Sequence, residues 1–304
     1  MDLTALDALR IALDPAGQAV LAIALVLIMF SVALSLSPRD FRCVTEAPKS
    51  YFGGVFAQMI GLPLLTVGLL LLLSPPPSIA LGMIVVACCP GGTVSNLLTF
   101  LGHGNLAYSV ALTATSSLLA AVVTPASILF WSNVYPPTGQ LLQTIDISPL
   151  NFVIQTMALL GLPLIAGMAL AAFAPGLASR LRKHSVRAGT LMLLGVIIYG
   201  CYLFMPVLLP ALPYLLAVVV VHNGLAFGLG VGSGLVLRTD PPTRRALMFE
   251  IGIQNSGLAI VILIAQLEGL GGAAAIATTW GLWHLVGGGF IVWGLRIKDR
   301  RGTH

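Results

Sequence analysis

Two polar segments interrupt long apolar runs of this chain. Residues 88–96 read Cys-Cys-Pro-Gly-Gly-Thr-Val-Ser-Asn, and residues 250–257 read Glu-Ile-Gly-Ile-Gln-Asn-Ser-Gly. Inside a bilayer, non-helical backbone persists only where protein or a water-filled cavity satisfies its hydrogen bonds. Secondary transporters place broken helices of this kind at their binding sites. The two segments therefore predict a ligand site within the membrane.

Glu250 is the only acidic residue inside a predicted membrane span. A carboxylate at the centre of such a helix costs about 2.5 to 3.5 kcal/mol on insertion scales, so we expect it to have a partner. One alternative is a glutamate at the membrane surface, about a turn and a half from Arg245. Pro241 and Pro242 favour an earlier helix start, which would place Glu250 deeper.

Apart from Arg244 and Arg245 at the start of the span at 243–266, no Lys or Arg lies inside a predicted span, so a bound cation is the expected partner of Glu250. Hydroxyl, amide and carboxylate oxygens suit a hard cation. The polar residues that offer them are Gln58, Thr93, Ser95, Asn96, Ser109, Thr113, Glu250 and Gln254. The alternative for each Ser or Thr is a hydrogen bond to its own helix backbone. Their convergence on the two breaks favours the cation site.

A half-helix is expected to begin after each break, at Thr93 and beside Asn255. The free amide groups and the positive dipole end of such a helix attract an anion. One crossing can thus bind cations and an organic anion together. His222 and His284 are interpreted as hydrogen-bonded core residues, and Cys88 with Cys89 as small packing residues rather than a metalloid site.

The composition indicates an integral membrane protein. The 304 residues are 58% hydrophobic and only 8% charged, with a mean hydropathy of +1.00, whereas soluble domains have about 25% charged residues. A spanning helix needs about 20 apolar residues. We predict a single all-α transmembrane domain over residues 1–304, with nine spans at 17–36, 50–73, 78–101, 106–130, 152–173, 188–209, 214–237, 243–266 and 271–295.

The distribution of positive charge predicts the orientation in the cell membrane. If nine spans alternate, 14 of the 15 Lys and Arg residues lie on one side, and Arg10 alone lies on the other. Cytoplasmic loops carry the excess of Lys and Arg. We therefore expect the N-terminus outside and the C-terminus in the cytoplasm, and neither a nucleic acid nor an obligatory protein partner.

The two broken spans also suggest an internal repeat. Matching span three to span eight gives a first repeat over about 17–130 and a second over about 152–296, opposite in topology. Such inverted repeats with crossed discontinuous helices recur in transporters. Gly224, Gly228 and Gly232 form overlapping GxxxG spacings in span seven, and we expect them to pack against a neighbouring helix.

The chain resembles the bile acid:sodium symporter family, and within it the members that have nine membrane spans. The resemblance rests on the two broken segments and on shorter matches at 37–41, 104–107, 221–224 and 283–284. It implies a core of crossed broken helices that moves against a panel of packed helices.

The resemblance also implies two sodium sites. One consists of Ser95, Asn96, Ser109, Thr113 and Glu250; the other consists of Gln58, Glu250, Gln254 and the carbonyls of Ile251 and Ile253. The substrate contacts it implies are Thr93, Asn255 and His284.

The function expected from this sequence is sodium-coupled uptake of an organic anion by alternating access, with two sodium ions. The anion is bile-acid-like or a small carboxylate such as a hydroxy or keto acid. The alternative is a proton-coupled or uncoupled carrier in which Glu250 titrates. An enzyme is not expected, because no paired carboxylates or nucleophile with a base lie in the spans. Sites built from broken helices suit a carrier better than a channel or a sensor.

Overall fold

The computed structural model describes residues 6–7, 9–10, 14–36, 42–145 and 148–301, so the predicted match at 37–41 lies outside the described residues. Throughout these ranges the regular elements are helices, and β-pairing is limited to two isolated bridges. The helices α2, α4, α6 and α9 to α12 each begin at a proline. Proline suits this first position because its missing N–H would have no intrahelical partner there. The all-α prediction is confirmed.

Within the described ranges, six helical segments are long and apolar enough to cross a membrane, so the protein is membrane-integral. They are α2 (Pro15–Ala33), the continuous α4–η2–α5 segment (Pro48–Leu73), α8 (Leu106–Val134), α10 (Pro149–Phe173), the last part of α11 (Leu208–Val236) and α14 (Gly271–Arg301). The predicted span at 188–209 lies inside α11 (Pro175–Val236), which is helical throughout. Nine spans remain a prediction.

Both broken spans are present as pairs of short helices. The first pair is α6 (Pro77–Cys88) with α7 (Thr93–Leu101), and the second is α12 (Pro241–Gly252) with α13 (Ser256–Ala265). Pro90 lies between α6 and α7 and interrupts the helix there, because proline has no backbone N–H to donate. Helix α12 ends where Ile253 becomes extended, with φ −117° and ψ 105°. The predicted half-helix starts at Thr93 and beside Asn255 are confirmed.

The two breaks meet and pair with each other. Gly91 and Gln254 form an antiparallel bridge, and the Asn255 N–H donates to the Pro90 carbonyl at 2.9 Å. These contacts satisfy part of the backbone that the helices leave unpaired, as a non-helical segment at membrane depth requires. The crossing of the broken helices is therefore held by main-chain bonds and not only by side chains.

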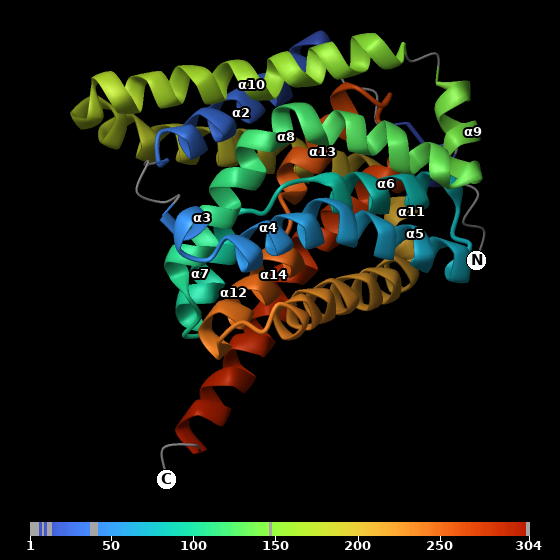
Figure 1. Cartoon of the computed structure of the whole chain (residues 1–304). Helices are drawn as coiled ribbons and strands as arrows, with labels where there is room; N and C mark the ends of the chain where they lie inside the picture. The colour runs from blue at the N-terminus through green and yellow to red at the C-terminus, as the bar shows by residue number, and fades with distance from the viewer. Residues whose placement is uncertain (1–5, 8, 11–13, 37–41, 146–147, 302–304) are drawn as a thin grey trace.

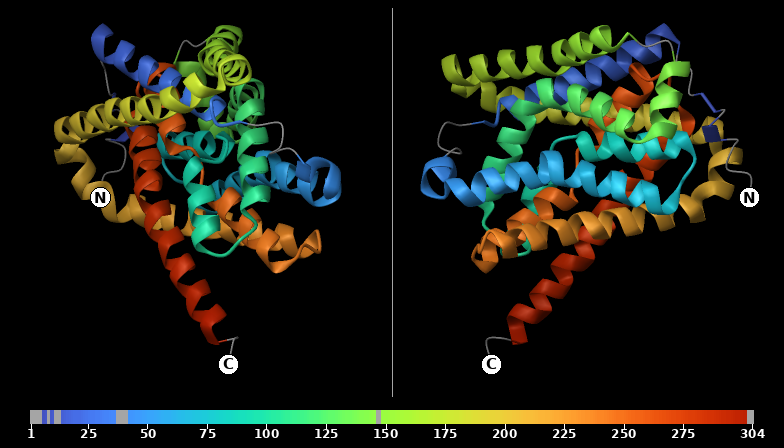
Figure 2. Two further views of the ribbon diagram at one scale, coloured as in Figure 1. Left: turned by 90° about the vertical axis from the view of Figure 1, so that its left-hand side faces the viewer. Right: turned by 45° about the vertical axis from the view of Figure 1, so that its right-hand side comes forward.

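Other helices enclose this crossing on several sides. Helices α2 and α10 run side by side along one side of the molecule in Figures 1 and 2. Helix α14 packs tightly on α6, because a Cβ on Gly82 would lie 2.3 Å from a side-chain carbon of Ile276. Its C-terminal end extends away from the other helices (Figures 1 and 2). The remaining short helices are α3 (Arg42–Glu46), the π-helical turn η2 (Ala57–Gly61) and α9 (Pro136–Thr144).

The expected packing of the GxxxG glycines is wrong. A Cβ added to Gly224, Gly228 or Gly232 would meet no atom within 4 Å in the described chain. Two other glycines of α11 make the close contact with α12: a Cβ on Gly230 would lie 2.5 Å from the Met248 Cα, and one on Gly234 2.6 Å from the Arg244 Cγ. The spacing alone does not say which face of a helix its neighbour covers.

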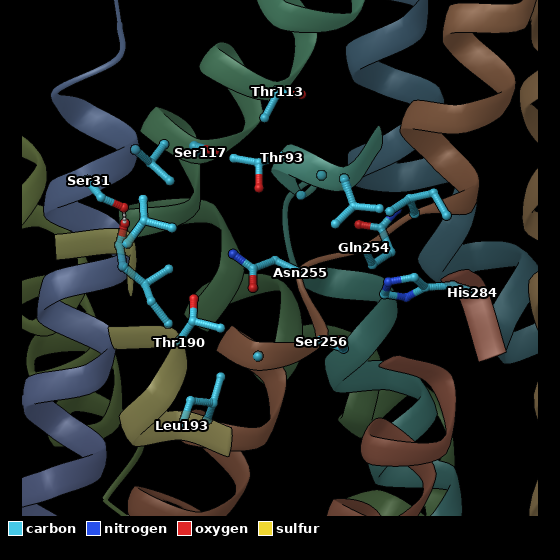
Figure 3. Close-up of a pocket in the computed structure, with 18 residues that line it drawn as sticks. Ser31, Thr93, Thr113, Ser117, Thr190, Leu193, Gln254, Asn255, Ser256 and His284 are labelled. Atoms are coloured by element: carbon cyan, nitrogen blue, oxygen red, sulfur yellow. Dashed lines mark hydrogen bonds between the residues drawn. The ribbon is translucent and has the colours of Figure 1, made fainter. Parts of the chain in front are cut away.

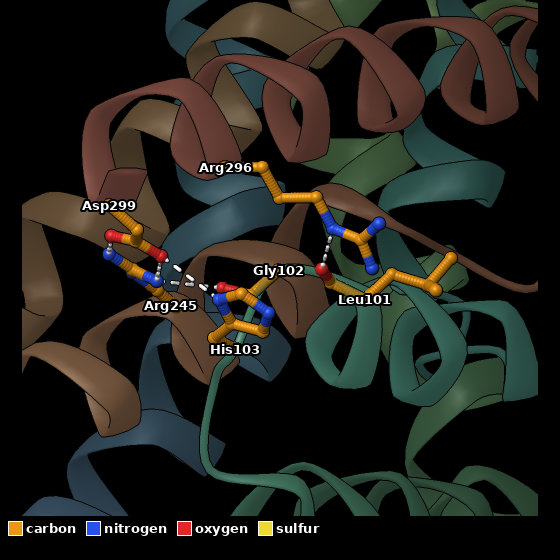
Figure 4. A network of polar contacts seen from close by, with 6 residues as sticks. All are labelled: Leu101, Gly102, His103, Arg245, Arg296 and Asp299. Carbon is orange, nitrogen blue, oxygen red and sulfur yellow. Dashed lines mark hydrogen bonds and ion pairs between the residues drawn. The ribbon is translucent and has the colours of Figure 1, made fainter. Parts of the chain in front are cut away.

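A polar cluster joins the ends of α7 and α14 to α12 (Figure 4). Arg245 donates to both carboxylate oxygens of Asp299 at 2.8 and 2.5 Å, and also to the Gly102 carbonyl at 2.9 Å. His103 Nδ1 lies 3.0 Å from Asp299, and Arg296 donates to the Leu101 carbonyl at 2.8 Å. Arg245 is therefore engaged by Asp299, which leaves it unavailable as the partner of Glu250.

Candidate functional site

Glu250 lies near the end of α12 and is completely buried, with 0% exposure. Three hydroxyls donate to its carboxylate: Ser95 at 2.6 Å, Ser109 at 3.1 Å and Thr113 at 2.7 Å. This burial disfavours the alternative of a glutamate at the membrane surface. The shared helix face predicted for Ser109 and Thr113 is confirmed, because both hydroxyls reach the same carboxylate.

Two further side chains extend this hydroxyl cluster. Asn96 Oδ1 lies 3.3 Å from the Thr113 hydroxyl oxygen, and the buried Thr99 donates to Ser109 at 3.2 Å. Thr99 was missed by the sequence reasoning, although it lies four residues after Ser95 in α7 and so on the same helix face. The structure thus gathers Ser95, Asn96, Ser109 and Thr113 around Glu250.

A second group of oxygens lies around the main chain at the end of α12. The buried Gln58 donates to the Glu250 carbonyl at 3.4 Å, and the buried Gln254 donates to the Ile251 carbonyl at 2.9 Å. Ile253 follows in the extended backbone of the break. Gln58 belongs to the π-helical turn η2, and such turns occur frequently at functional sites. The sequence reasoning did not predict this turn.

Gly91 makes the close approach between the breaks possible. A Cβ at this position would lie 2.0 Å from Glu250 Oε1 and 3.0 Å from Gln58 Nε2. Only a residue without a side chain therefore fits between the carboxylate and the glutamine. The backbone of the first break thus contacts the side chains that come from α4–η2 and α12.

The electrostatics of this cluster favour a bound cation. Among the described residues, no ion pair involves Glu250, whereas Asp299 pairs with Arg245 and His103. The Oε1 atoms of Gln58 and Gln254 are buried without a hydrogen-bond donor. Buried oxygens of this kind need a donor or a positive charge. A hard cation that takes carboxylate, amide and hydroxyl oxygens would satisfy all of them.

A cavity of about 220 Å³ adjoins the crossing on the side of α2 and α11 (Figure 3). Thr93, Asn255 and His284 all line it, so the structure brings the three predicted substrate contacts together. Asn255 also caps α13, because its Oδ1 accepts from the Leu258 N–H at 3.0 Å. No Lys or Arg is among the residues that line the cavity. The N-termini of α7 and α13 are therefore its positive features.

Three hydroxyl residues of the cavity were missed by the sequence reasoning. Ser31 comes from α2, Ser117 from α8 and Thr190 from α11. In Figure 3, Ser31 and Thr190 lie across from Thr93 and Asn255, and Ser117 lies near Thr93. Single Ser and Thr residues in apolar helices carry no signal of their own, because most bond to their own backbone, as Ser31 does to the Ile28 carbonyl at 2.6 Å.

Broken helices that cross inside a membrane protein, with oxygen clusters and a cavity at the crossing, are typical of secondary transporters. The chain belongs to the sodium bile acid symporter family, whose profile matches residues 22–205. The family and its relatives are named for sodium-dependent transport or cotransport. The protein is therefore a member of the sodium-dependent transporters.

Three relatives illustrate the range of the family. A Bacillus subtilis protein named Uncharacterized sodium-dependent transporter YocS is 33% identical over 287 residues, which cover 90% of this chain and 83% of the relative. An Arabidopsis thaliana chloroplast protein named Probable sodium/metabolite cotransporter BASS1 is 30% identical over 79% of this chain and 58% of its own length. The human ileal sodium/bile acid cotransporter is 25% identical over 80% of this chain and 68% of its own length.

Proposed function

We propose that this protein is a symporter that couples the inward movement of sodium to the uptake of an organic anion by alternating access. The observation that carries the proposal is the Glu250 carboxylate, which is buried, bonded by three hydroxyls and, among the described residues, paired with no cationic side chain. A bound sodium ion supplies the missing positive charge. A carboxylate in this environment is otherwise costly.

Two sodium ions are proposed, in two sites that share Glu250. The first would take the oxygens of Ser95, Asn96, Ser109, Thr113 and Glu250, which the hydrogen bonds already connect. The second would take Gln58, Glu250, Gln254 and the carbonyls of Ile251 and Ile253. The donor-free Oε1 atoms of Gln58 and Gln254 support this second assignment.

The anion is proposed to bind in the adjoining cavity, with contacts to Thr93, Asn255 and His284. Its negative charge would face the starts of α7 and α13, where free N–H groups and the helix dipoles favour anions. Pockets for drug-sized ligands are usually about 300 to 1,000 Å³. The cavity of about 220 Å³ is smaller, which favours a small carboxylate such as a hydroxy or keto acid over a bile-acid-like steroid.

The proposed stoichiometry gives a useful driving force. Two sodium ions with one monovalent anion carry one net charge. Each tenfold sodium gradient contributes about 1.4 kcal/mol per ion, and a potential of about 100 mV adds about 2.3 kcal/mol for the net charge. The sum of about 5 kcal/mol allows accumulation over roughly three to four decades of concentration.

Uptake into proteoliposomes tests the proposal. Labelled small carboxylates should accumulate when an inward sodium gradient is imposed, and not when potassium replaces sodium. Uptake that follows a proton gradient and ignores sodium would instead support a proton-coupled carrier in which Glu250 titrates. Labelling the termini from each side of sealed vesicles tests the proposed orientation, with the N-terminus outside and the C-terminus in the cytoplasm.

A further inference from the structure

His222 and Asn223 are adjacent polar residues of α11 that the proposed function does not use. Both are buried, with exposures of 0% and 1%. Neighbouring residues of an α-helix point about 100° apart, so the two side chains face different neighbours. Their partners lie on the two segments that would supply the second sodium site.

Asn223 holds the end of α12. Its Nδ2 donates to the Gly252 carbonyl at 2.6 Å, and Gly252 is the last residue of that helix. This carbonyl lies in sequence between those of Ile251 and Ile253, the two proposed to bind sodium. The bond directs the Gly252 oxygen toward α11. It thereby fixes the orientation of the peptide units on which the proposed backbone ligands depend.

The contact of Asn223 is the end of a longer packing face. Phe227 and Gly230 follow Asn223 at i+4 and i+7, on the same face of α11. A Cβ on Gly252 would lie 2.1 Å from the Phe227 ring, and one on Gly230 would lie 2.5 Å from the Met248 Cα. These close approaches set the register of α11 along α12. Asn223 therefore contacts the break at a defined position.

His222 holds the segment that carries Gln58. Its Nε2 lies 2.7 Å from Thr66 Oγ1 in α5 (Leu62–Leu73), the helix that follows the π-helical turn. Thr66 donates its own hydroxyl proton to the Leu62 carbonyl at 2.8 Å, so His222 must be the donor to Thr66. The imidazole ring packs on Trp280 of α14, with centroids 4.7 Å apart, which restrains its orientation.

We propose that His222 and Asn223 are a positioning pair for the second sodium site. Through this pair, one turn of α11 sets the distance between the end of α12 and the segment that bears Gln58. The inference rests on the proposed sodium coupling, which assigns that site. It adds that the site depends on side chains that do not touch the ion.

Sodium titrations of uptake in proteoliposomes test the pair, with the half-saturating sodium concentration and the substrate KM measured separately. Asn223→Ala and His222→Ala should raise half-saturating sodium about tenfold, equivalent to about 1.4 kcal/mol, and reduce cooperativity. The substrate KM at saturating sodium should stay unchanged. Thr66→Val, a milder change that removes the acceptor of His222, should act in the same direction. His222→Gln should restore part of the affinity, because its amide can donate to Thr66.

A matched control separates positioning from general stability. Thr138→Val removes another buried hydroxyl, which bonds to the Ser132 carbonyl at 2.6 Å away from the crossing. It should lower the melting temperature and leave half-saturating sodium unchanged. The positioning role is overturned if Asn223→Ala and Thr66→Val lower stability as this control does and keep the wild-type sodium dependence. If the wild-type protein itself ignores sodium, the proposed function fails instead.

Discussion

Replacing Glu250 by glutamine removes the buried charge and changes little else. The two side chains have nearly the same size, and the amide oxygen of glutamine can still accept from a hydroxyl. Ser95, Ser109 and Thr113 now donate to this carboxylate at 2.6 to 3.1 Å. The effect of Glu250→Gln therefore reports on the charge itself and not on a cavity or a lost helix contact.

The expected loss of sodium affinity is large. Two unit charges 4 Å apart attract by about 4 kcal/mol at an effective dielectric constant of about 20. Each 1.4 kcal/mol is a factor of about ten, so sodium binding should weaken nearly a thousandfold. Without sodium the effect on stability should have the opposite sign, because the wild-type protein buries an uncompensated carboxylate and Glu250→Gln does not.

Thermal unfolding of the purified protein in sodium and in potassium measures both effects. An ion that binds only the folded state raises the melting temperature. We expect sodium to stabilise the wild-type protein and to have no effect on Glu250→Gln. In potassium the glutamine variant should melt at the same temperature as the wild type or above it. Glu268→Gln makes the same change at an exposed position and should keep the full response to sodium.

Two results would refute the reasoning. A normal sodium response in Glu250→Gln would mean that this carboxylate binds no sodium, and both site assignments would fall. A variant that melts well below the wild type in potassium would mean that the charge stabilises the fold without an ion. The second result would require a cationic partner for Glu250, which the described residues do not contain.

Three other substitutions test the crossing, the cavity and the polar cluster. Gly91→Ala should weaken sodium binding at least about tenfold, because its Cβ would lie 2.0 Å from Glu250 Oε1. Gly92→Ala should leave sodium binding unchanged, because the atom nearest to its Cβ would be 3.7 Å away. Equal sodium titrations of the two variants would contradict this reasoning. Asn255→Asp keeps an acceptor for the cap of α13 but adds a negative charge to the cavity, so it should abolish anion uptake and spare the sodium-induced thermal shift. Asp299→Asn should lower the melting temperature through the loss of its ion pair with Arg245 and leave sodium dependence intact, and a changed sodium titration would link this end of α14 to the ion site.

Much of the site could be predicted because its chemistry is unusual for a membrane. Proline, glycine and a carboxylate are unusual in an apolar helix, and the physical consequence of each can be stated before the fold is known. Pro90 and Glu250 identified the two breaks in this way. The i, i+4 spacing of Ser109 and Thr113 then predicted one shared face, and both hydroxyls contact Glu250.

The features that escaped prediction depend on which helix faces meet. The π-helical turn at Gln58 has no distinctive sequence, since its residues would also suit an ordinary α-helix. The choice between Gly228 and Gly230 as the packing glycine is made by α12, a tertiary neighbour. Ser31 and Thr190 reach the cavity only because α2 and α11 lie beside it. The repeats and the nine spans remain predictions.

The hydroxyls that bind Glu250 lie 137 to 155 residues before it in the chain. A ribosome makes the chain from its N-terminus, so α7 and α8 enter the membrane before α12 does. The buried carboxylate of Glu250 is thus synthesised after the hydroxyl groups that solvate it. The order of helices along the chain is therefore also an order of assembly, in which the charge with the highest cost of insertion arrives at a prepared site.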